Sequence, residues 1–520
     1  MESNLSKIGT QFVKYMYAGI SLCIVIIVAT TSPSSFTLTK KPFLFSNPAL
    51  LIASTLLVGI LFSLGFVPVK HFRHSPRSEC TRFDKLVLRL TLFAIPIQFY
   101  LTCNYYFRTG WDVQVLDTGV DALLSGNAYP MSLYLSFYPN NILLFLVTII
   151  CKQLDAIFGV ISPSNGVLLF ILLNCIISSV TGWLTYQNIS HFCSRRWATV
   201  GFVLYWGLIG ISPWVSIPYS DSLALAFPSL LLFLYTRNFT PILKWGLIGV
   251  ISGIAYNVKP QSFLIFIAIV IITLIHSNFT ALYKKRVSCF ILILSLFVSL
   301  LFPKFLLSPM GISFNSDLSF GSAHFLMLGA NPRTHGYYAE EDFNFSASFP
   351  TREERNHADL QSFFQRMNDY GLTGYLNVLH DKTTFAYNDG TFAWNVEGNF
   401  WDTIYPEKNN FISPAMRSFY YEDGSNYALW CTWAQFLWLA TLLFAAFSAL
   451  NKQHSKSLSV LQLTLCGLFL FEMLFEVRAR YIYTCVPLFI VLAIVGLHNI
   501  YQFILLPSKH LSKNLLDEVK

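Results

Sequence analysis

Residues 458–475 read LSVLQLTLCGLFLFEMLF and residues 481–503 read YIYTCVPLFIVLAIVGLHNIYQF, with only EVRAR (476–480) between them. Each run is close to the roughly 20 apolar residues that a helix needs to cross the hydrocarbon core of a bilayer. Backbone that crosses lipid must satisfy its own hydrogen bonds, so runs of this kind form helices. The stretch therefore predicts two successive transmembrane helices joined by a short charged turn.

The rest of the chain repeats this pattern. Hydrophobic residues make up 54% of the 520 residues and charged residues only 12%, whereas a soluble globular chain carries about a quarter charged residues. We predict an all-α polytopic membrane protein with about twelve transmembrane helices. The apolar runs that predict them lie at residues 12–32, 48–69, 86–103, 165–187, 198–214, 222–236, 245–258, 260–277, 287–305, 429–449, 458–475 and 481–503.

One further apolar stretch, residues 140–160, is interrupted by Lys152 and Asp155. We expect it to form an interfacial or re-entrant helix, because the other runs then place every basic loop on the same side. The alternative is that this stretch crosses the membrane and another run does not.

The net charge of +8 arises mainly from short loops between the apolar runs. Basic clusters in such loops mark the cytoplasmic side, so the charge does not indicate nucleic acid. We therefore predict a multi-pass plasma-membrane protein, of a pattern that favours a bacterial membrane, with both termini inside and the first span retained. The clusters comprise Lys70, Arg73, Arg77, Arg82, Lys85 and Arg89; Arg195 and Arg196; Arg237 and Lys244; Lys284, Lys285 and Arg286; Lys452 and Lys456; and Lys509, Lys513 and Lys520.

This orientation divides the chain into four parts. Two N-terminal helices (1–85) precede a transmembrane core (86–305), whose first outward loop spans residues 104–140. A long polar and aromatic loop (306–428) is predicted to fold outside the membrane as a small domain of mixed structure, which could cover a site. The last transmembrane helices and a cytoplasmic tail follow (429–520).

The first outward loop carries the acid of greatest interest, Asp112, which directly follows Trp111. The aromatic residues near it suit any membrane interface, but a carboxylate at head-group depth could act as a general base. Asp117 and Asp121 are spaced to share a face of a short surface helix, with Asp112 pointing elsewhere. We expect those two acids on the solvated side.

A second outward segment is the turn IPYSDS (217–222), which precedes an apolar helix. Ser220 or Asp221 is a natural N-cap there, which alone would explain both residues. The alternative use is an anion site, because an outward helix N-terminus favours phosphate.

Three bases lie near the outer ends of spans, where the positive-inside rule disfavours them. They are Lys259, within AYNVKPQSF, and Arg478 and Arg480, within FEVRARYIY. Bases so placed often pair with an anion, and a lipid phosphate is one candidate. The alternative is an ion pair between Glu476 and one of the arginines.

The long loop contains several residues suited to chemistry or binding: His324, Arg333, His335, Asp389, Trp394 and Glu397. Aromatic rings with amides and acids suit carbohydrate, although ordinary packing of a loop domain uses the same residues. The histidines and acids lack a metal-ligand spacing, and no C-x-x-C occurs, so we predict no metal site, while a divalent cation is not excluded.

The ordered motifs resemble those of the GT-C superfamily, the polyprenyl-phosphate-sugar-dependent glycosyltransferases. The chain looks closest to bacterial relatives of protein mannosyltransferases and of PIG-V type mannosyltransferases, over roughly residues 86–503. Two positions depart from the family pattern: Val113 stands where many members have a second acid, and YPN (138–140) replaces YPP. The matching pieces are GWD (110–112), SFYPNN (136–141), CSRRWA (193–198), PYSDSL (218–223), VKPQ (258–261) and RARYIY (478–483).

The resemblance implies an inverting transfer in which Asp112 is the general base on the acceptor hydroxyl. Lys259, Arg478 and Arg480 would bind the departing lipid phosphate and stabilise its charge. The two N-terminal helices would be an addition to the family core. The residues expected to line the cavity or bind substrate are Trp111, Asp117, Tyr138, Asn140, Tyr219, Asp221 and His324.

The expected function is therefore transfer of one sugar from a polyprenyl-phosphate donor to an acceptor outside the cytoplasm. The acceptor would be a cell-wall glycan, a teichoic acid, a glycolipid or a protein, and the donor's tail would lie in membrane lipid. No G-x-G-x-x-G or P-loop motif occurs, so no nucleotide fold or organic cofactor is expected. Three alternatives stay open: a carrier or flippase for a lipid-linked glycan, a polyprenyl-diphosphate-dependent polymerase or ligase, and a non-catalytic partner-binding protein.

Overall fold

The computed structural model describes residues 4–32, 43–63, 77–158, 166–277, 286–398, 401–451 and 455–505. Over these residues the chain is an all-α polytopic membrane protein, in which the two short strands β1 (Arg108–Thr109) and β2 (Trp401–Thr403) form the sheet structure. Several of the bases used to predict orientation lie outside the described residues: Lys70, Arg73, Lys284, Lys285, Lys452, Lys509, Lys513 and Lys520.

Nine helices within the described residues are long and apolar enough to cross a membrane, and three shorter apolar helices accompany them. The nine contain α1 (Asn4–Thr30), α3 (Arg77–Thr102), α6 (Ile142–Phe158), α7 (Val167–Phe192), α11 (Pro241–Val258), α14 (Arg286–Phe305), α19 (Tyr427–Ala446), α20 (Lys456–Leu474) and α21 (Val486–Leu505). The shorter ones are α2 (Asn47–Ser63), the pair α9 (Ser220–Leu223) and α10 (Ala226–Thr236), and α12 (Leu264–Ile275).

The predicted run 198–214 does not form one span. It is divided into α8 (Arg195–Tyr205), a π-helical turn at Trp206–Gly210 and a 3-10 turn at Pro213–Ser216. Proline lacks the backbone N–H that a continuing helix needs, so the helix cannot run on through Pro213.

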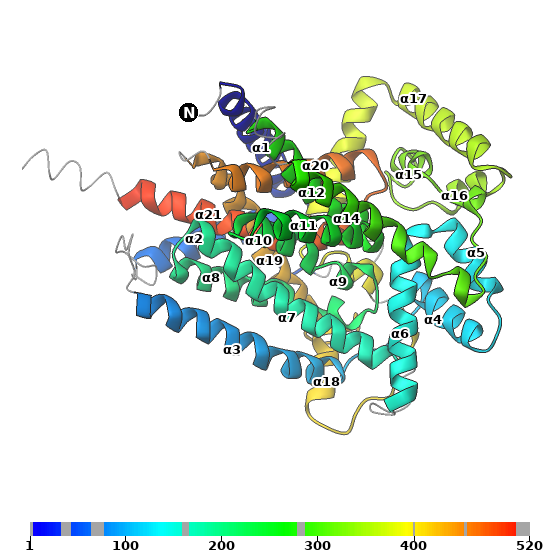
Figure 1. Ribbon diagram of the computed structural model, residues 1–520. Helices are drawn as coiled ribbons and strands as arrows, with labels where there is room; N and C mark the ends of the chain where they lie inside the picture. The colour runs from blue at the N-terminus through cyan, green and yellow to red at the C-terminus, as the bar shows by residue number, and fades with distance from the viewer. Residues whose placement is uncertain are drawn as a thin grey trace, which may run out of the picture.

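The 140–160 stretch forms α6, which is long and apolar enough to span. Figure 1 nevertheless shows α6 running across α3 and α7 rather than alongside them. The direction of α6 fits the prediction of an interfacial helix. Its length fits the alternative prediction, in which the helix crosses the membrane. Lys152 within it is buried rather than facing lipid.

Helix α21 forms the centre of the bundle and packs against α7, α8 and α19. Gly496 makes the contact with α19 possible, because a Cβ atom there would meet the Phe444 carbonyl oxygen at 1.9 Å. Small residues likewise bring α11 and α14 together, since Gly249 and Gly253 face Ser295 and Ser299. Close approach through small residues is a usual way for helices to associate in lipid.

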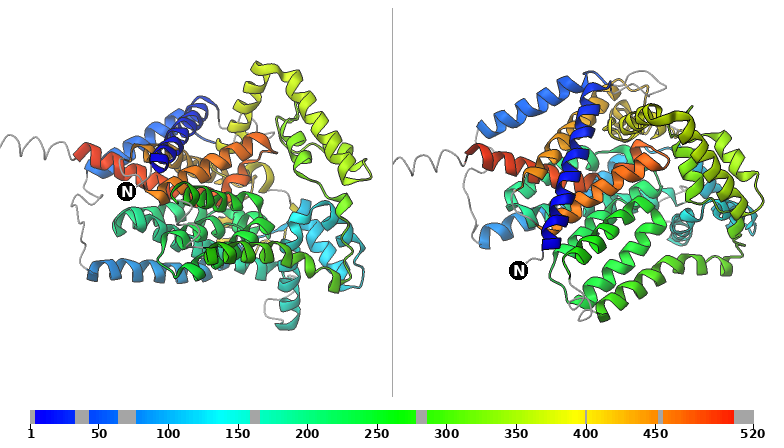
Figure 2. Two further views of the ribbon diagram at one scale, coloured as in Figure 1. Left: turned by 45° about the horizontal axis from the view of Figure 1, so that its top comes forward. Right: turned by 90° about the horizontal axis from the view of Figure 1, so that it is seen from above.

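The first outward loop and the long loop gather at one end of this bundle. Figure 1 shows α4 (Trp111–Leu124) and α5 (Tyr129–Phe137) beside α15 (Ser322–Gly329), α16 (Glu340–Ala347) and α17 (Arg352–Tyr387), away from the C-terminal end of α21, and Figure 2 agrees. β1 pairs antiparallel with β2 and so joins the first loop to the long loop. The described part of the long loop is mainly helical, and it also includes α18 (Ile412–Tyr420).

Helix α17 bends where its sequence requires it. Thr351 and Glu354 form a capping box at its start, which satisfies two backbone N–H groups reciprocally. Gly371 lies in the middle with φ of 57°, a left-handed conformation that glycine adopts without strain. The helix therefore runs as two straight segments rather than one (Figure 2).

Buried amides fix the loops that carry the site. Asn174 of α7 donates hydrogen bonds to the carbonyls of Val215 and Ile217, at 3.1 and 2.9 Å, and so holds the chain just before the PYSD turn. Asn47 of α2 donates to Asn388 Oδ1, 2.5 Å away, at the end of α17. Through this contact α2 anchors the segment of the long loop that follows α17.

Candidate active site

Asp112 lies in the first turn of α4, partly buried among aromatic side chains. The hydroxyl of Tyr219 donates a hydrogen bond to its Oδ2 atom at 2.8 Å. The Trp111 and Tyr219 rings meet edge to face, with centroids 4.9 Å apart. Trp111 has φ of 46°, and a non-glycine residue in that region stores strain of the kind found at functional sites.

Two further tyrosines lie near the carboxylate: Tyr134 in α5 and Tyr138, the residue that follows this helix. Burial, and next the charge of Asp112, raises the pKa of each above the ordinary value. Their hydroxyls are therefore neutral at physiological pH. Asn141 donates to the Tyr134 hydroxyl at 2.7 Å and accepts from the exposed Asn140 at 3.3 Å. Asn140 is thus linked to Tyr134 through Asn141.

Asp221 does not cap a helix, which was one of the two interpretations of the PYSD turn from sequence. Helix α9 begins at Ser220, with Tyr219 at its N-cap position, and Asp221 lies within the helix. The Asp221 side chain is fully buried, pairs with Lys259, and accepts from Arg480 Nη1 at 3.0 Å. An ion pair between distant segments, rather than local capping, explains this acid.

Glu397, at the end of the long loop's π-helical turn Trp394–Gly398, holds both arginines. Its two oxygens lie 2.9 Å from Arg478 Nη1 and 2.6 Å from Arg480 Nε. The Tyr337 hydroxyl donates to the same carboxylate at 2.7 Å. Although burial raises the pKa of Glu397, Arg478 and Arg480 outweigh it and leave the pKa below its ordinary value.

Arg478 also pairs with Glu476, at 2.9 Å, so the ion pair named as the alternative from sequence is present. The ion pairs with Glu397 and Glu476 use the Nη1 and Nε atoms of Arg478. A guanidinium has five N–H groups, so these two contacts do not use all of its donors.

The acid and the arginines meet at one pair of rings. The Arg480 guanidinium lies 4.9 Å from the centre of the Trp111 ring and 5.3 Å from that of Tyr219. Tyr219 also binds Asp112. Tertiary folding therefore brings a carboxylate and a buried guanidinium to the same aromatic pair.

A family model described as a conserved hypothetical integral membrane protein matches residues 5–500, from α1 to α21. The chain belongs to this family. No curated protein matches the chain. The family description names a membrane location but no reaction.

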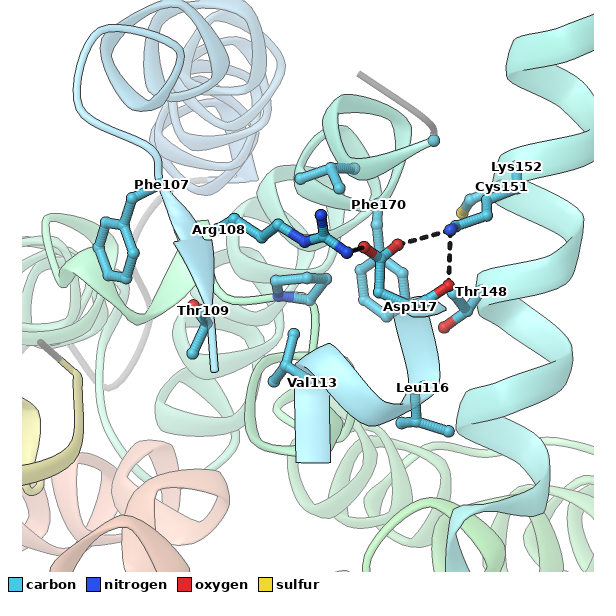
Figure 3. Close-up of a pocket in the computed structure, with 13 residues that line it drawn as sticks. Phe107, Arg108, Thr109, Val113, Leu116, Asp117, Thr148, Cys151, Lys152 and Phe170 are labelled. Atoms are coloured by element: carbon cyan, nitrogen blue, oxygen red, sulfur yellow. Dashed lines mark hydrogen bonds and ion pairs between the residues drawn. The ribbon is translucent and has the colours of Figure 1, made fainter. Parts of the chain in front are cut away.

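Asp117 lies apart from Asp112 and the tyrosines around it. It lines a pocket between α4, α6 and α7, where it bridges Arg108 at 2.8 Å and Lys152 at 2.6 Å (Figure 3). Asp121 shares the same lysine at 2.7 Å, which confirms that the two acids lie on one face. Only Asp121 is well solvated: its side chain is 47% exposed against 14% for Asp117, so the prediction of a solvated Asp117 is wrong. The buried amine of Lys152 draws both acids toward α6.

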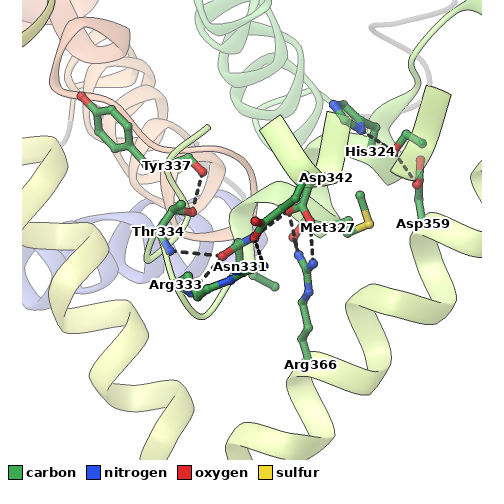
Figure 4. A network of polar contacts seen from close by, with 12 residues as sticks. His324, Met327, Asn331, Arg333, Thr334, Tyr337, Asp342, Asp359 and Arg366 are labelled. Carbon is green, nitrogen blue, oxygen red and sulfur yellow. Dashed lines mark hydrogen bonds and ion pairs between the residues drawn. The ribbon is translucent and has the colours of Figure 1, made fainter. Parts of the chain in front are cut away.

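His324 belongs to the interior of the long loop rather than to the Asp112 cluster. Its Nδ1 lies 2.7 Å from Ser346 Oγ, and the serine gives its single proton to Asp359, so the imidazole is the donor (Figure 4). Nearby, Arg366 binds Asp342 through two nitrogens at 2.6 and 2.9 Å. These contacts join α15, α16 and α17.

The burial of His324 predicts a pH-dependent stability. Burial is the main reason that the pKa of His324 falls from 6.5 to about 4, while Asp342 raises it and Arg355 lowers it. The unfolded chain then binds the extra proton more readily, so stability is complete above pH 6.5 and is lost as pH falls toward 4. Denaturant unfolding should show about 2 kcal/mol less stability from this group at pH 5 than at pH 7.

His324→Gln should remove that part of the pH dependence while keeping a side chain able to donate to Ser346. Equal slopes of stability against pH in the two proteins would contradict this assignment.

Two features of the site were not assigned to it from sequence: the tyrosines Tyr134 and Tyr337, and the role of Glu397. Tyr134 lies one helical turn before Tyr138, a predicted cavity residue. This spacing is the local feature of the sequence that could have indicated its place in the site. Among the described residues no group of three or more His, Cys, Asp and Glu side chains could hold a metal ion.

Proposed function

We propose that this protein is an inverting membrane glycosyltransferase that uses a polyprenyl-phosphate-linked sugar as its donor. The observation that carries the proposal is the placement of Asp112 and Arg480 against the same two rings, Trp111 and Tyr219. A general base and a group that stabilises a leaving phosphate must both reach one reacting carbon. Contact with one pair of rings supports that requirement for Asp112 and Arg480.

In the proposed reaction, Asp112 takes the proton of the acceptor hydroxyl as its oxygen attacks the anomeric carbon. The bond from that carbon to the phosphate oxygen breaks, and the electron pair leaves with the lipid phosphate. Arg478, Arg480 and Lys259 then stabilise the charge that collects on the phosphate. Attack opposite the leaving group inverts the configuration.

The aromatic surroundings support a sugar at this place. Trp111 and Tyr138 contribute aromatic rings here, and Trp111 Nε1 is buried with no hydrogen-bond acceptor among the described residues. A buried donor left unpaired costs free energy unless a ligand accepts from it. A sugar hydroxyl beside Asp112 would satisfy it.

We propose that the site faces the outside of the cytoplasmic membrane. The donor's polyprenyl tail would lie in membrane lipid beside the bundle, and the acceptor, a cell-wall glycan, teichoic acid, glycolipid or protein, would approach from outside the cytoplasm. Helices α15–α17 would cover the site from that side. We place the protein in a bacterial plasma membrane.

The test is transfer by the purified protein in lipid nanodiscs. A short-chain polyprenyl-phosphate carrying a labelled sugar is supplied together with envelope glycans, and the release of polyprenyl phosphate is followed by mass spectrometry. The matched donor carries a diphosphate in place of the monophosphate. We expect turnover with the monophosphate donor alone; turnover confined to the diphosphate donor would overturn the proposal in favour of a polymerase or ligase.

A second arm separates an enzyme from a carrier. Proteoliposomes receive the labelled donor in one leaflet, and its appearance in the other leaflet is measured with and without acceptor. Movement of intact donor between leaflets with no transfer under any condition would favour a flippase.

A further inference from the structure

The two arginines proposed to bind the donor phosphate already hold an anion, and that anion comes from the long loop. The carboxylate of Glu397 contacts Arg478 and Arg480 through its two oxygens, at 2.9 and 2.6 Å. One planar group with two oxygens facing two guanidinium groups is also the way in which a phosphate binds arginines. Glu397 therefore occupies the position that a phosphate would need.

The charges around it show why this matters for an incoming anion. Lys259, Arg478 and Arg480 carry three positive charges, and their direct partners Asp221, Glu397 and Glu476 carry three negative ones. A neutral buried cluster offers a phosphodiester little attraction. If the Glu397 carboxylate leaves, the remaining groups have a charge of +1, which matches the single negative charge of a phosphodiester.

The backbone beside Glu397 is not relaxed. Phe392 and Ala393 have φ of 55° and 64°, so two consecutive non-glycine residues lie in the left-handed region. Such residues cost on the order of 1–3 kcal/mol each. Asp389 holds them there by accepting from the backbone N–H groups of Thr391 and Ala393, both at 2.8 Å. Relaxation of this turn would offset part of the cost of removing Glu397 from the arginines.

We propose that Glu397 is an internal competitor of the donor phosphate, so that donor binding displaces the turn Trp394–Gly398 from Arg478 and Arg480. The inference rests on the proposed function, since it takes those arginines as the phosphate site. In this role Glu397 selects among anions. An anion binds only if it interacts with Arg478 and Arg480 more favourably than the Glu397 carboxylate does.

The opposite role for Glu397 is that of a fixed partner that orients the arginines for substrate. The two roles predict opposite effects of neutralising it. A competitor that is weakened lets phosphate bind more tightly, whereas an orienting partner that is weakened lets it bind less tightly.

The experiment measures binding of farnesyl phosphate to the full-length protein in nanodiscs, with inorganic phosphate in a parallel arm. Glu397→Gln should tighten binding of farnesyl phosphate on the order of tenfold, a usual size for one coupled interaction. Glu422→Gln removes the same charge from an exposed position of the long loop and should leave affinity unchanged. An equal increase in affinity for inorganic phosphate would mean that the site recognises the phosphate group alone. A larger increase for farnesyl phosphate would mean that it also binds the lipid chain.

Tyr337→Phe provides a second variant if Glu397→Gln folds poorly. It removes the hydrogen bond that the hydroxyl donates to Glu397 at 2.7 Å but keeps the ring. This variant should also tighten binding, by a smaller factor. In the wild type, farnesyl phosphate should speed hydrogen exchange at the amides of Val396 and Glu397, which both bond to the Ala393 carbonyl.

The outcomes separate this inference from the proposed function. Unchanged or weaker binding in Glu397→Gln and Tyr337→Phe, together with loss of binding in Arg480→Gln, would overturn the competitor role and leave the phosphate site standing. Unchanged binding in Arg480→Gln would overturn both.

Discussion

Replacing Asp112 with Asn should lower the rate of sugar transfer by about 10²–10⁴-fold while leaving donor binding intact. The amide keeps the shape of the side chain and can still accept from the Tyr219 hydroxyl, now at 2.8 Å. It cannot take a proton from the acceptor. The measurement is single-turnover transfer from a labelled polyprenyl-phosphate sugar, beside equilibrium binding of the same donor.

Asp121→Asn is the matched control for that variant. It lies on the same helix and removes the same charge, but its partly exposed carboxylate faces Lys152 rather than the tyrosines. Transfer by this control should stay within about twofold of the wild type, as for most surface substitutions. Undiminished transfer by Asp112→Asn would show that another group is the base.

Replacing Arg480 with Gln should weaken donor binding by about 2–5 kcal/mol, the usual cost of truncating one partner of a buried charged contact. That loss corresponds to a factor of roughly 30 or more in dissociation constant. Arg480 is 6% exposed and pairs with both Asp221 and Glu397, so the change also leaves two buried acids short of a partner. Donor affinity is measured by titration in nanodiscs, with thermal unfolding followed on the same samples.

Two comparisons separate lost binding from lost folding. Arg480→Lys keeps the charge but not the planar fork, so it should fold better than the Gln variant while regaining only part of the affinity. Arg333→Gln removes an arginine whose side chain is 75% exposed on the long loop and should change neither quantity. If Arg480→Gln unfolds no more easily than the wild type and binds donor equally well, the phosphate role of Arg480 is wrong.

Hydropathy predicted the class of the fold, and it did so for a local reason. A run such as 458–475 has to be a helix wherever it lies in lipid, because its backbone has no water to bond. The same reasoning was least reliable where a single residue interrupts a helix. The apolar run 198–214 does not form one helix, because Pro213 cannot continue it. For Lys152, sequence showed an interruption in an apolar run but not the two acids of α4 that bind it.

The candidate residues were found unequally. Asp112, Lys259, Arg478 and Arg480 stand out because a charge at the end of an apolar run is rare. For Asp221, the local sequence suited a helix cap and an anion-binding site equally. Its actual partners lie far along the chain, so no local pattern could name them.

Glu397 shows the limit most clearly. The sequence marked it only as one of several residues of the long loop suited to chemistry or binding. Nothing beside it in NVEGNF indicates that it reaches two arginines at the start of the last span. Two left-handed residues and the amide contact between Asn47 and Asn388 place that turn where it is. Both are consequences of packing.

The sequence by itself determined that this protein lies in the membrane as a bundle of helices, and which few charged residues are out of place there. Burial in lipid depends on the composition of one contiguous run, so it can be read along the chain. Only the tertiary structure decided which charges meet: Asp112 with Tyr219, Asp221 with Lys259 and Arg480, and Glu397 with both arginines. Ion pairs form through space over a few ångströms, and their partners here come from segments that hydropathy treats as unrelated.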